Sequence, residues 1–173
     1  MAIILGIDPG SRVTGYGLVH SNGNKLEHLD CGCIRTQSKY FPERLKTIFK
    51  ELCLIIEHHR PQQVAIEEVF MGRNANSALK LGQARGAAMV ACLSFDLSVS
   101  EYSARKVKQA VVGAGAADKD QVNHMVKALL KINDSVAEDA ADALAIAICH
   151  ANTQSNLIRM SGARSFSKKR LRG

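Results

Sequence analysis

The chain opens with AIILGID (residues 2–8), a nearly continuous apolar run that ends in a carboxylate. A short apolar run bounded by a turn is typical of a central β-strand that is covered on both faces. The turn follows at once, because Pro9 and Gly10 come directly after Asp8. An acid at the end of a core strand is unusual, since burying an unpaired charge costs several kcal/mol. Asp8 is therefore a candidate functional residue.

Three further acids stand beside apolar runs. Glu67 follows VAI, and Asp139 and Asp142 lie three residues apart in AEDAADALAIAI (137–148). Residues at i and i+3 of a helix project from the same face, and the small alanines between them let the helix lie close to a sheet. Acids that are distant in sequence and have no His or Cys at ligand spacing favour a hard cation such as Mg²⁺. Each acid alone also has a structural explanation, such as a turn cap at Asp8 or a favourable helix-start charge at Asp139.

The rest of the pattern predicts an α/β fold with the order βββαβαβα and then further helices. Strands are expected at 2–8, 14–20, 26–36, 63–70 and 97–102, and helices at 42–59, 78–94, 104–112, 119–131 and 136–151. The expected N-caps are Asn76 or Ser77, Ser103 and Asp118. We expect one mixed five-stranded sheet, made of a three-strand antiparallel meander plus parallel strands, with helices on both faces.

Composition indicates one soluble domain. The chain has 173 residues and is 46% hydrophobic, and it contains no apolar run of membrane-spanning length. The N-terminus enters a strand pattern without a basic segment, so we expect no signal peptide. Five cysteines, an odd number, indicate reduced thiols and a cytoplasmic protein rather than a disulfide framework.

The net charge of +7 is concentrated near the C-terminus. Residues 151–173 contain no acid and six basic side chains, namely Arg159, Arg164, Lys168, Lys169, Arg170 and Arg172. We place a folded domain at 1–152 and a basic, disordered tail at 153–173. The tail is either a solubilising segment or a non-specific contact for nucleic-acid phosphates.

Four blocks in this order and spacing resemble the RuvC-type Holliday junction resolvases of the ribonuclease H-like superfamily. They are GIDPGSRVTGYGLV (6–19), AIEEVF (65–70), ALKLGQARG (78–86) and AEDAADALAIA (137–147), and the similarity spans residues 3–150. The resemblance implies a catalytic acidic tetrad of Asp8, Glu67, Asp139 and Asp142. By strand alternation Glu67 and Glu68 point to opposite faces, and the residues alone do not decide between them. The resemblance selects Glu67. Family members often have Gln where Glu68 stands, and some have His at the position of Asp139.

The resemblance also implies a function. The expected activity is that of a Mg²⁺-dependent endodeoxyribonuclease that resolves four-way DNA junctions in recombination and repair. It would make paired nicks in opposed strands that leave 5′-phosphate and 3′-hydroxyl ends. Two Mg²⁺ ions about 4 Å apart, with Mn²⁺ as a substitute, would be held by the tetrad and would activate water and neutralise the leaving oxygen. The implied partners are junction DNA, a second copy of the chain, and a branch-migration motor complex of the RuvA and RuvB type.

Three further residues, Lys108, Lys119 and Phe70, match functional positions of the family, and other basic residues lie near Phe70 in the chain. Lys108 and Lys119 are expected to aid catalysis or to hold a backbone phosphate, and a solvated helix face is the alternative. Phe70 is expected to stack on an unpaired base, and a place in the core is the alternative. The candidates for phosphate contacts are Arg73, Lys80 and Arg85. The Ala- and Gly-rich helix at 78–92 is the candidate dimer interface, because an isologous dimer suits a substrate with two-fold symmetry.

Two alternatives remain open from the residues. One is an actin-like or sugar-kinase-like ATP-binding protein, which opens with a similar strand and Asp–Gly turn but needs two large lobes. The other is a ribonuclease H-like nuclease that acts on another nucleic-acid structure, or a DNA-binding module with an inactive site. The choice of a four-way junction rests wholly on the resemblance.

Overall fold

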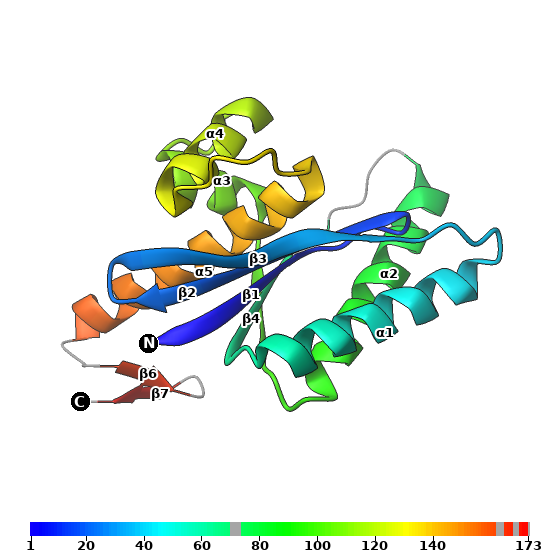
Figure 1. Ribbon diagram of the computed structural model, residues 1–173, viewed down its shortest axis with the longest axis horizontal. Coiled ribbons are helices and arrows are strands. Elements are labelled where there is room, and N and C mark those ends of the chain that lie inside the picture. The colour runs from blue at the N-terminus through cyan, green and yellow to red at the C-terminus, as the bar shows by residue number, and fades with distance from the viewer. Residues whose placement is uncertain (70–73, 162–164, 168–169, 173) are drawn as a thin grey trace.

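The computed structural model describes residues 1–69, 74–161, 165–167 and 170–172, and it is an α/β fold (Figure 1). The elements in chain order are β1 (Ala2–Asp8), β2 (Val13–Asn22), β3 (Lys25–Arg35), α1 (Phe41–His59), β4 (Gln63–Glu67), α2 (Ala75–Leu93), β5 (Val99–Tyr102), α3 (Ala104–Val112), α4 (Lys119–Leu130), α5 (Glu138–Ser161), β6 (Ser165–Ser167) and β7 (Arg170–Arg172).

The main sheet has five strands in the order β3-β2-β1-β4-β5. Strands β1, β2 and β3 form an antiparallel meander, and β4 and β5 continue the sheet in parallel with β1. The apolar run AIILGID is thus a central strand, because it pairs with β2 on one side and β4 on the other. The predicted fold class is confirmed.

Helices cover both faces of this sheet, as Figure 1 shows, with α1 and α2 on one face and α3, α4 and α5 on the other. Side chains of β1 alternate between the two resulting cores. Leu5 and Ile7 pack with α1 and α2, whereas Ile4 packs with α3, α4 and α5. By the same alternation Asp8 lies on the α5 side of the sheet.

Glycines let α5 lie against the sheet. A Cβ on Gly6 of β1 would stand 2.1 Å from the carbonyl oxygen of Ala143, and a Cβ on Gly15 of β2 would stand 1.9 Å from that of Asp139. Real side chains do not tolerate such distances, so any larger residue would push the helix away. Glycine inside a strand weakens the strand. Here the packing of α5 against the sheet, which glycine permits, offsets that loss.

Local capping signals locate most helix starts. The side chains of Ser103 and Asp118 accept hydrogen bonds from Lys106 N and Gln121 N, which confirms both predicted caps. The start of α2 was predicted wrongly. Asn74, rather than Asn76 or Ser77, is the N-cap, because its side chain accepts the backbone N–H of Ser77.

Two elements end three or more residues away from the expected position. Strand β4 ends at Glu67 rather than at residue 70. Helix α5 continues to Ser161, ten residues past the expected end, because no Pro or Gly interrupts the sequence before Gly162. The prediction of disorder is therefore wrong for residues 153–161, which are helical, and β6 pairs with β7 beyond them. The proposed boundary at residue 152 lies inside α5.

Candidate active site at the carboxyl ends of the central strands

Two of the predicted acids meet at the ends of neighbouring parallel strands. The register of β1 and β4 pairs Ile7 with Ile66. The next residues, Asp8 and Glu67, therefore lie side by side at one edge of the sheet. Ala65 packs in the core on the α5 side, so alternation places Glu67 on the same face as Asp8.

The other two acids come from the first turns of α5, which begins at Glu138. The backbone of Asp139 touches β2 at Gly15, and Gly15 pairs with Asp8 across the β1–β2 ladder. Asp142 follows one turn later on the same helix face. The start of α5 thus brings Asp139 and Asp142 to the end of β1 where Asp8 stands.

The electrostatics of Asp8 show that the four carboxylates act on one another. Burial raises the pKa of Asp8 to about 7, and the charges of Glu67, Asp142 and Asp139 contribute in the same direction, opposed by Lys119. Burial is also the largest cause that raises the pKa of Glu67, followed by the charge of Asp142. Negative charge is therefore in excess at this edge of the sheet.

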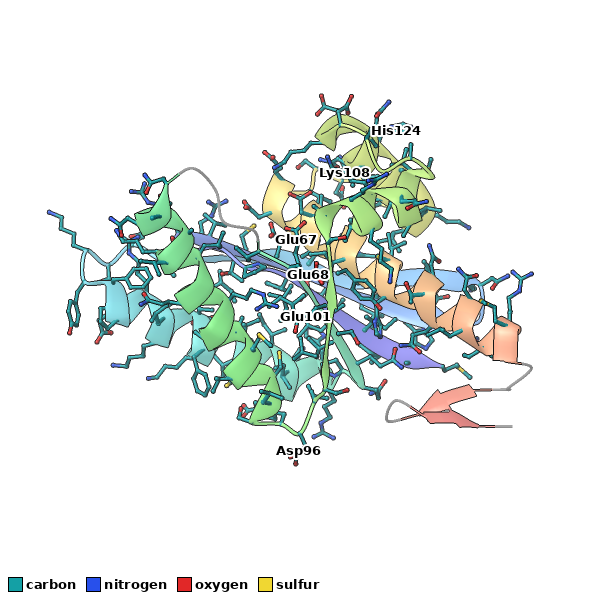
Figure 2. All side chains as sticks on the ribbon, turned by 180° about the vertical axis from the view of Figure 1, so that it is seen from behind. Glu67, Glu68, Asp96, Glu101, Lys108 and His124 are labelled. Carbon is teal, nitrogen blue, oxygen red and sulfur yellow. The ribbon has the colours of Figure 1, made fainter. Side chains whose placement is uncertain are left out.

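Both predicted lysines lie at the acids. Lys119, the first residue of α4, forms ion pairs with Glu138 and with Asp142, whose Oδ2 is 3.6 Å from its Nζ. Lys108 on α3 lowers the pKa of Glu67 by its charge, as does Lys119. Figure 2 shows Lys108 on the helix next to the end of the strand that carries Glu67. Both lysines therefore lie near the acids, and their part in catalysis or in phosphate binding stays a prediction.

Arg85 holds the backbone of Glu67 in place. Its Nε donates to the carbonyl oxygen of Glu67 at 3.1 Å, and its guanidinium pairs with Glu101 on β5. The predicted phosphate contact of Arg85 stays a prediction, since these two partners already occupy the guanidinium. Glu68 donates its backbone N–H to Tyr102 of β5 and is not among the groups that raise the pKa of Asp8.

The donor set suits a hard divalent cation. All four side chains offer carboxylate oxygens, which are the ligands that Mg²⁺ prefers. Their mutual repulsion would be offset by a cation, as Lys119 offsets it in part. Their oxygens are not gathered at coordination distance, since the described residues contain no group of three or more His, Cys, Asp or Glu side chains arranged as a metal cluster. Binding would have to draw the acids together.

The other predicted contacts lie on α2 or precede it in the chain. Lys80 is exposed on α2, where it lines a separate basic cavity. Phe70 and Arg73 lie outside the described residues. Inspection of the sequence missed Gly15 and the supporting role of Arg85. Glycine inside a strand pattern was the available signal for Gly15, because it often marks a close backbone approach.

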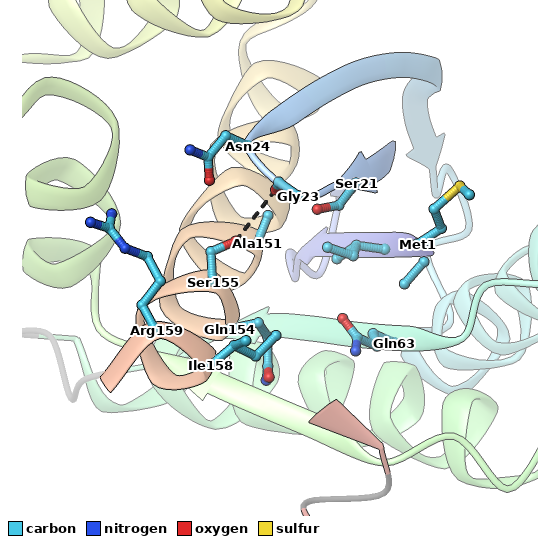
Figure 3. A pocket seen from close by; sticks show the side chains of 12 residues that line it. Met1, Ser21, Gly23, Asn24, Gln63, Ala151, Gln154, Ser155, Ile158 and Arg159 are labelled. Carbon is cyan, nitrogen blue, oxygen red and sulfur yellow. Dashed lines mark hydrogen bonds between the residues drawn. The ribbon is translucent and has the colours of Figure 1, made fainter. Parts of the chain in front are cut away.

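A cavity at the opposite end of the sheet is unrelated to this site. It has a volume of about 320 Å³, and it is lined by Met1, Gln63 and the C-terminal half of α5 (Figure 3). It borders the start of β1, whereas Asp8 ends that strand, and a strand of this length spans roughly 20 Å. No helix in the described parts of the chain combines the length and apolar character needed to cross a membrane.

Comparison with known proteins gives consistent matches. The family model for crossover junction endodeoxyribonuclease RuvC matches residues 4–150. A curated RuvC of Marinobacter nauticus is 61% identical over 161 residues, which cover 93% of this chain and 92% of the relative. One of Teredinibacter turnerae is 59% identical and covers 98% and 99% of the two chains.

Solved structures agree with these sequence matches. Thermus thermophilus RuvC in complex with a Holliday junction substrate superposes with a TM-score of 0.85 at 33% identity, over 90% of this chain and 96% of that one. The yeast mitochondrial Holliday junction resolvase Ydc2 has a TM-score of 0.62 at 12% identity, covering 91% and 83% of the two chains. The second likeness supports the fold alone.

Proposed function

This chain belongs to the RuvC family of crossover junction endodeoxyribonucleases, and from that membership we propose that it resolves four-way DNA junctions in recombination and repair. It nicks two opposed strands and leaves 5′-phosphate and 3′-hydroxyl ends that a ligase can join. The observation that carries the proposal is the meeting of Asp8, Glu67, Asp139 and Asp142 at one sheet edge, within the matched residues 4–150.

The tetrad is proposed to hold two Mg²⁺ ions, with Mn²⁺ as a substitute. The bound ions would supply an activated water and charge stabilisation for the leaving 3′-oxygen. The excess negative charge around Asp8 supports this assignment. The side chains of the chain itself orient the acids: Arg85 holds the backbone of Glu67, and the first turns of α5 hold the two aspartates.

The lysines are proposed to act on the phosphate that is cut. Lys119 is exposed and pairs with acids at the site, so an incoming phosphate can compete for its ammonium group. Lys108 stands on the neighbouring helix, close enough to act on the charge of Glu67. Each would neutralise charge that builds up on the phosphate during the reaction.

Opening of the junction centre is assigned to the residues that precede α2 in the chain. Phe70 would stack on an unpaired base there, and Arg73 would contact a nearby phosphate. Position in the chain supports this proposal, since both residues fall between Glu67, where β4 ends, and Asn74, which caps α2. Lys80 would contact DNA from the same helix.

The active form is proposed to be a homodimer built on α2. Leu79, Val90 and Leu93 are 68%, 56% and 54% exposed. Gly82 and Gly86 lie on the same face, with open space where a side chain would stand. The spacing of these five residues repeats every three or four positions, which is one stripe along a helix. A second copy that covers this stripe would give two active sites for two opposed cuts.

Partners and location follow from family membership. We propose a branch-migration motor complex of the RuvA and RuvB type as the partner that delivers the junction. The proposed location is the cytoplasm. The ATP-binding alternative has no support in the family match, and a nucleotide-binding measurement with the purified protein would test it directly.

Cleavage of four labelled substrates side by side tests the function. The purified protein is incubated in Mg²⁺ with a four-way junction, a flap, a linear duplex and an RNA–DNA hybrid of matched sequence. We expect paired symmetric nicks in the junction, with ligatable products, and little cutting of the other three. Preferential cutting of the flap or of the hybrid would instead support a ribonuclease H-like nuclease with another substrate.

A further inference from the structure

A basic cavity lies near the acidic tetrad. A cavity of about 210 Å³ opens where the turn between β1 and β2, the loop after β3 and the starts of α1 and α2 come together. Its described lining contains no acid. It holds four cations and two hydroxyl groups, those of Arg12, Lys39, Arg44, Lys80, Ser11 and Ser77.

No acidic side chain of the described residues neutralises the positive charge of this cavity. Within the described residues, none of its four cations forms an ion pair. Glu43, one residue before Arg44, is engaged with Lys46 at 3.5 Å. In contrast, Arg85 and Lys119 each have a carboxylate partner. Four like charges around one hollow repel one another, and an anion in the hollow would offset that repulsion.

Hydrogen bonds hold the walls in place. The Nε of Arg44 donates to the carbonyl oxygen of Ser38 at 2.6 Å, which orients the guanidinium. Buried Thr36 donates its backbone N–H to Arg12 O at 2.9 Å and its hydroxyl to Ser11 O at 3.0 Å. The turn that carries Ser11 and Arg12 is thus tied to the end of β3. A preorganised set of donors of this kind binds an anion with little loss of entropy.

The cavity also has a defined relation to Asp8. Ser11 comes three residues after Asp8, so their Cα atoms are at most about 11 Å apart. One DNA strand rises about 3.4 Å per nucleotide. The wall of the cavity that Ser11 forms is therefore about three nucleotide steps from the end of β1, and we expect a phosphate bound there to be a few nucleotides from the scissile phosphate.

We propose that this cavity binds one backbone phosphate of a junction arm, on the strand that is cut, and that it positions the scissile phosphate over the tetrad. The inference rests on the proposed junction-cleaving function and adds a second, remote phosphate site to it. Arg12, Lys39 and Arg44 are positioning residues in this proposal, since they are assigned to a phosphate other than the one that is cut. Lys80, expected from the sequence to contact DNA, joins the same site.

Neutral variants of the cavity give the first test. The double variant Arg12→Gln/Lys39→Gln is compared with Lys50→Gln/Lys131→Gln, and the single variant Arg44→Gln is compared with Lys50→Gln. Each control removes the same charge at exposed lysines that form no ion pair among the described residues. Junction affinity is measured without cleavage, in EDTA, over a series of salt concentrations. Removal of one phosphate contact lowers the slope of log K against log salt by about 0.9 and weakens binding roughly tenfold. Each control should change neither quantity beyond its general charge effect.

Neutralising the DNA gives the second test. Each phosphate near the cut is replaced in turn by an uncharged methylphosphonate. At one position within about three nucleotides of the cut, the replacement should lower the junction affinity of the wild type roughly tenfold. The same replacement should leave the junction affinity of Arg12→Gln/Lys39→Gln unchanged. The cut made by this variant should also be spread over several positions along the strand.

The outcomes separate this inference from the function on which it rests. A wild-type protein that fails to cut junctions in Mg²⁺ overturns the proposed function. The phosphate site alone is overturned if the wild type cuts junctions but two results fail. These are that no methylphosphonate position weakens the wild type and spares the cavity variant, and that the cavity variant and its control have equal salt slopes. Thermal melting of each variant verifies folding, and the exposed Lys39→Gln single variant repeats the test if a double variant melts early.

Discussion

Glu67 and Glu68 are adjacent in the chain, yet only one of them belongs with Asp8. Alternation from Ala65, which packs on the α5 side, places Glu67 on the face where α5 begins. The charge of Glu67 contributes to the raised pKa of Asp8, and Lys108 and Lys119 act on Glu67 in turn. The choice between the two glutamates therefore follows from which face of one strand a side chain occupies.

We predict that Asp8→Asn, Glu67→Gln and Asp142→Asn each abolish junction cleavage and leave junction binding within a few-fold of the wild type. In the proposed mechanism the carboxylates would hold the ions that supply the chemistry, whereas phosphate contacts would supply the affinity. Single-turnover cleavage in Mg²⁺ and binding in EDTA measure the two quantities separately. Glu68→Gln is the matched control and should cleave normally. Near-normal cleavage by any of the first three variants would remove that residue from the ligand set.

His150 provides a second prediction, about acid stability. Its ring bonds the hydroxyl of Tyr102 at 2.9 Å and Oε1 of Gln63 at 3.1 Å. Burial lowers the pKa of His150 from 6.5 to about 4. The unfolded chain therefore binds a proton that the folded protein does not, and folding loses stability as the pH falls from 6.5 to about 4.

The expected loss from His150 is up to about 3 kcal/mol. His150→Gln keeps one donor and one acceptor but does not titrate. Urea unfolding across this pH range should show that the wild type loses its stability relative to the variant. Comparing the two proteins cancels the opposite effect of Asp8, whose raised pKa favours the folded state as the pH falls. A constant difference between the two curves would contradict the prediction.

At the scale of elements, the position of α5 decides the site. The helix supplies two of the four acids, and it reaches the sheet only because β1 and β2 present glycine where its backbone passes. The close approach combines Gly6 and Gly15 with small helix residues such as Ala143. Strand ends and helix start are thereby fixed relative to one another.

We predict that Gly15→Ala displaces the start of α5 and lowers the cleavage rate about a hundredfold, because misplacement of catalytic groups by about 1 Å has effects of this size. The added Cβ would lie 1.9 Å from Asp139 O. Overpacking should also cost about 1–3 kcal/mol of stability. Cleavage rate, junction affinity and urea unfolding are measured on the same preparation.

Gly32→Ala is the matched control on the neighbouring strand β3. Its added Cβ would meet the side chain of Tyr16 at 2.8 Å rather than a helix backbone. It should share part of the stability loss but keep the cleavage rate. Equal rate losses in both variants would mean that general strain, and not the position of α5, explains the effect.

At the scale of the whole molecule, charged groups gather at one end of the central strands. The acids, the lysines of α3 and α4, and the basic cavity lie around the same end of the central strands. The apolar stripe of α2 is available for a second copy, and the C-terminal segment carries further basic residues. Two predictions, one on assembly and one on the C-terminal charge, concern the whole molecule.

The first concerns assembly. We predict that Val90→Glu converts the proposed dimer to a monomer, because an unpaired charge buried within the stripe opposes association. Leu54→Glu on α1 is the control, since Leu54 and Val90 are 57% and 56% exposed. Sedimentation measures the assembly state, and cleavage should shift from paired nicks to single nicks in the monomer. A dimer that persists in Val90→Glu would place the interface elsewhere.

The second concerns the C-terminal charge. Because α5 continues to Ser161, a truncation that spares the helix removes residues 162–173, which contain five basic residues and no acid. We predict that this variant cleaves at the normal rate with saturating DNA but binds more weakly at raised salt. Every phosphate that the segment no longer neutralises lowers the salt slope by about 0.9 on duplex arms. An unchanged slope would assign the segment to solubility alone.

The sequence by itself determined the order of the elements, the fold class and the caps at Ser103 and Asp118, and it singled out the candidate acids. These features depend on residues close together in the chain, through hydrophobic period, local hydrogen bonds and short motifs. The family motif added the choice of Glu67, which alternation alone left open. The end of α5 was misjudged because a polar segment without Pro or Gly is compatible with both helix and disorder.

Only the tertiary structure decided how these parts meet. The contact of Gly15 with Asp139 joins positions far apart in the chain, as does the bond from Arg85 to Glu67. The basic cavity draws its cations from the β1–β2 turn, the loop after β3 and two helices, so no single segment signals it. The physical reason is that close packing and charge clustering depend on distances in space, which the local pattern of a sequence does not contain.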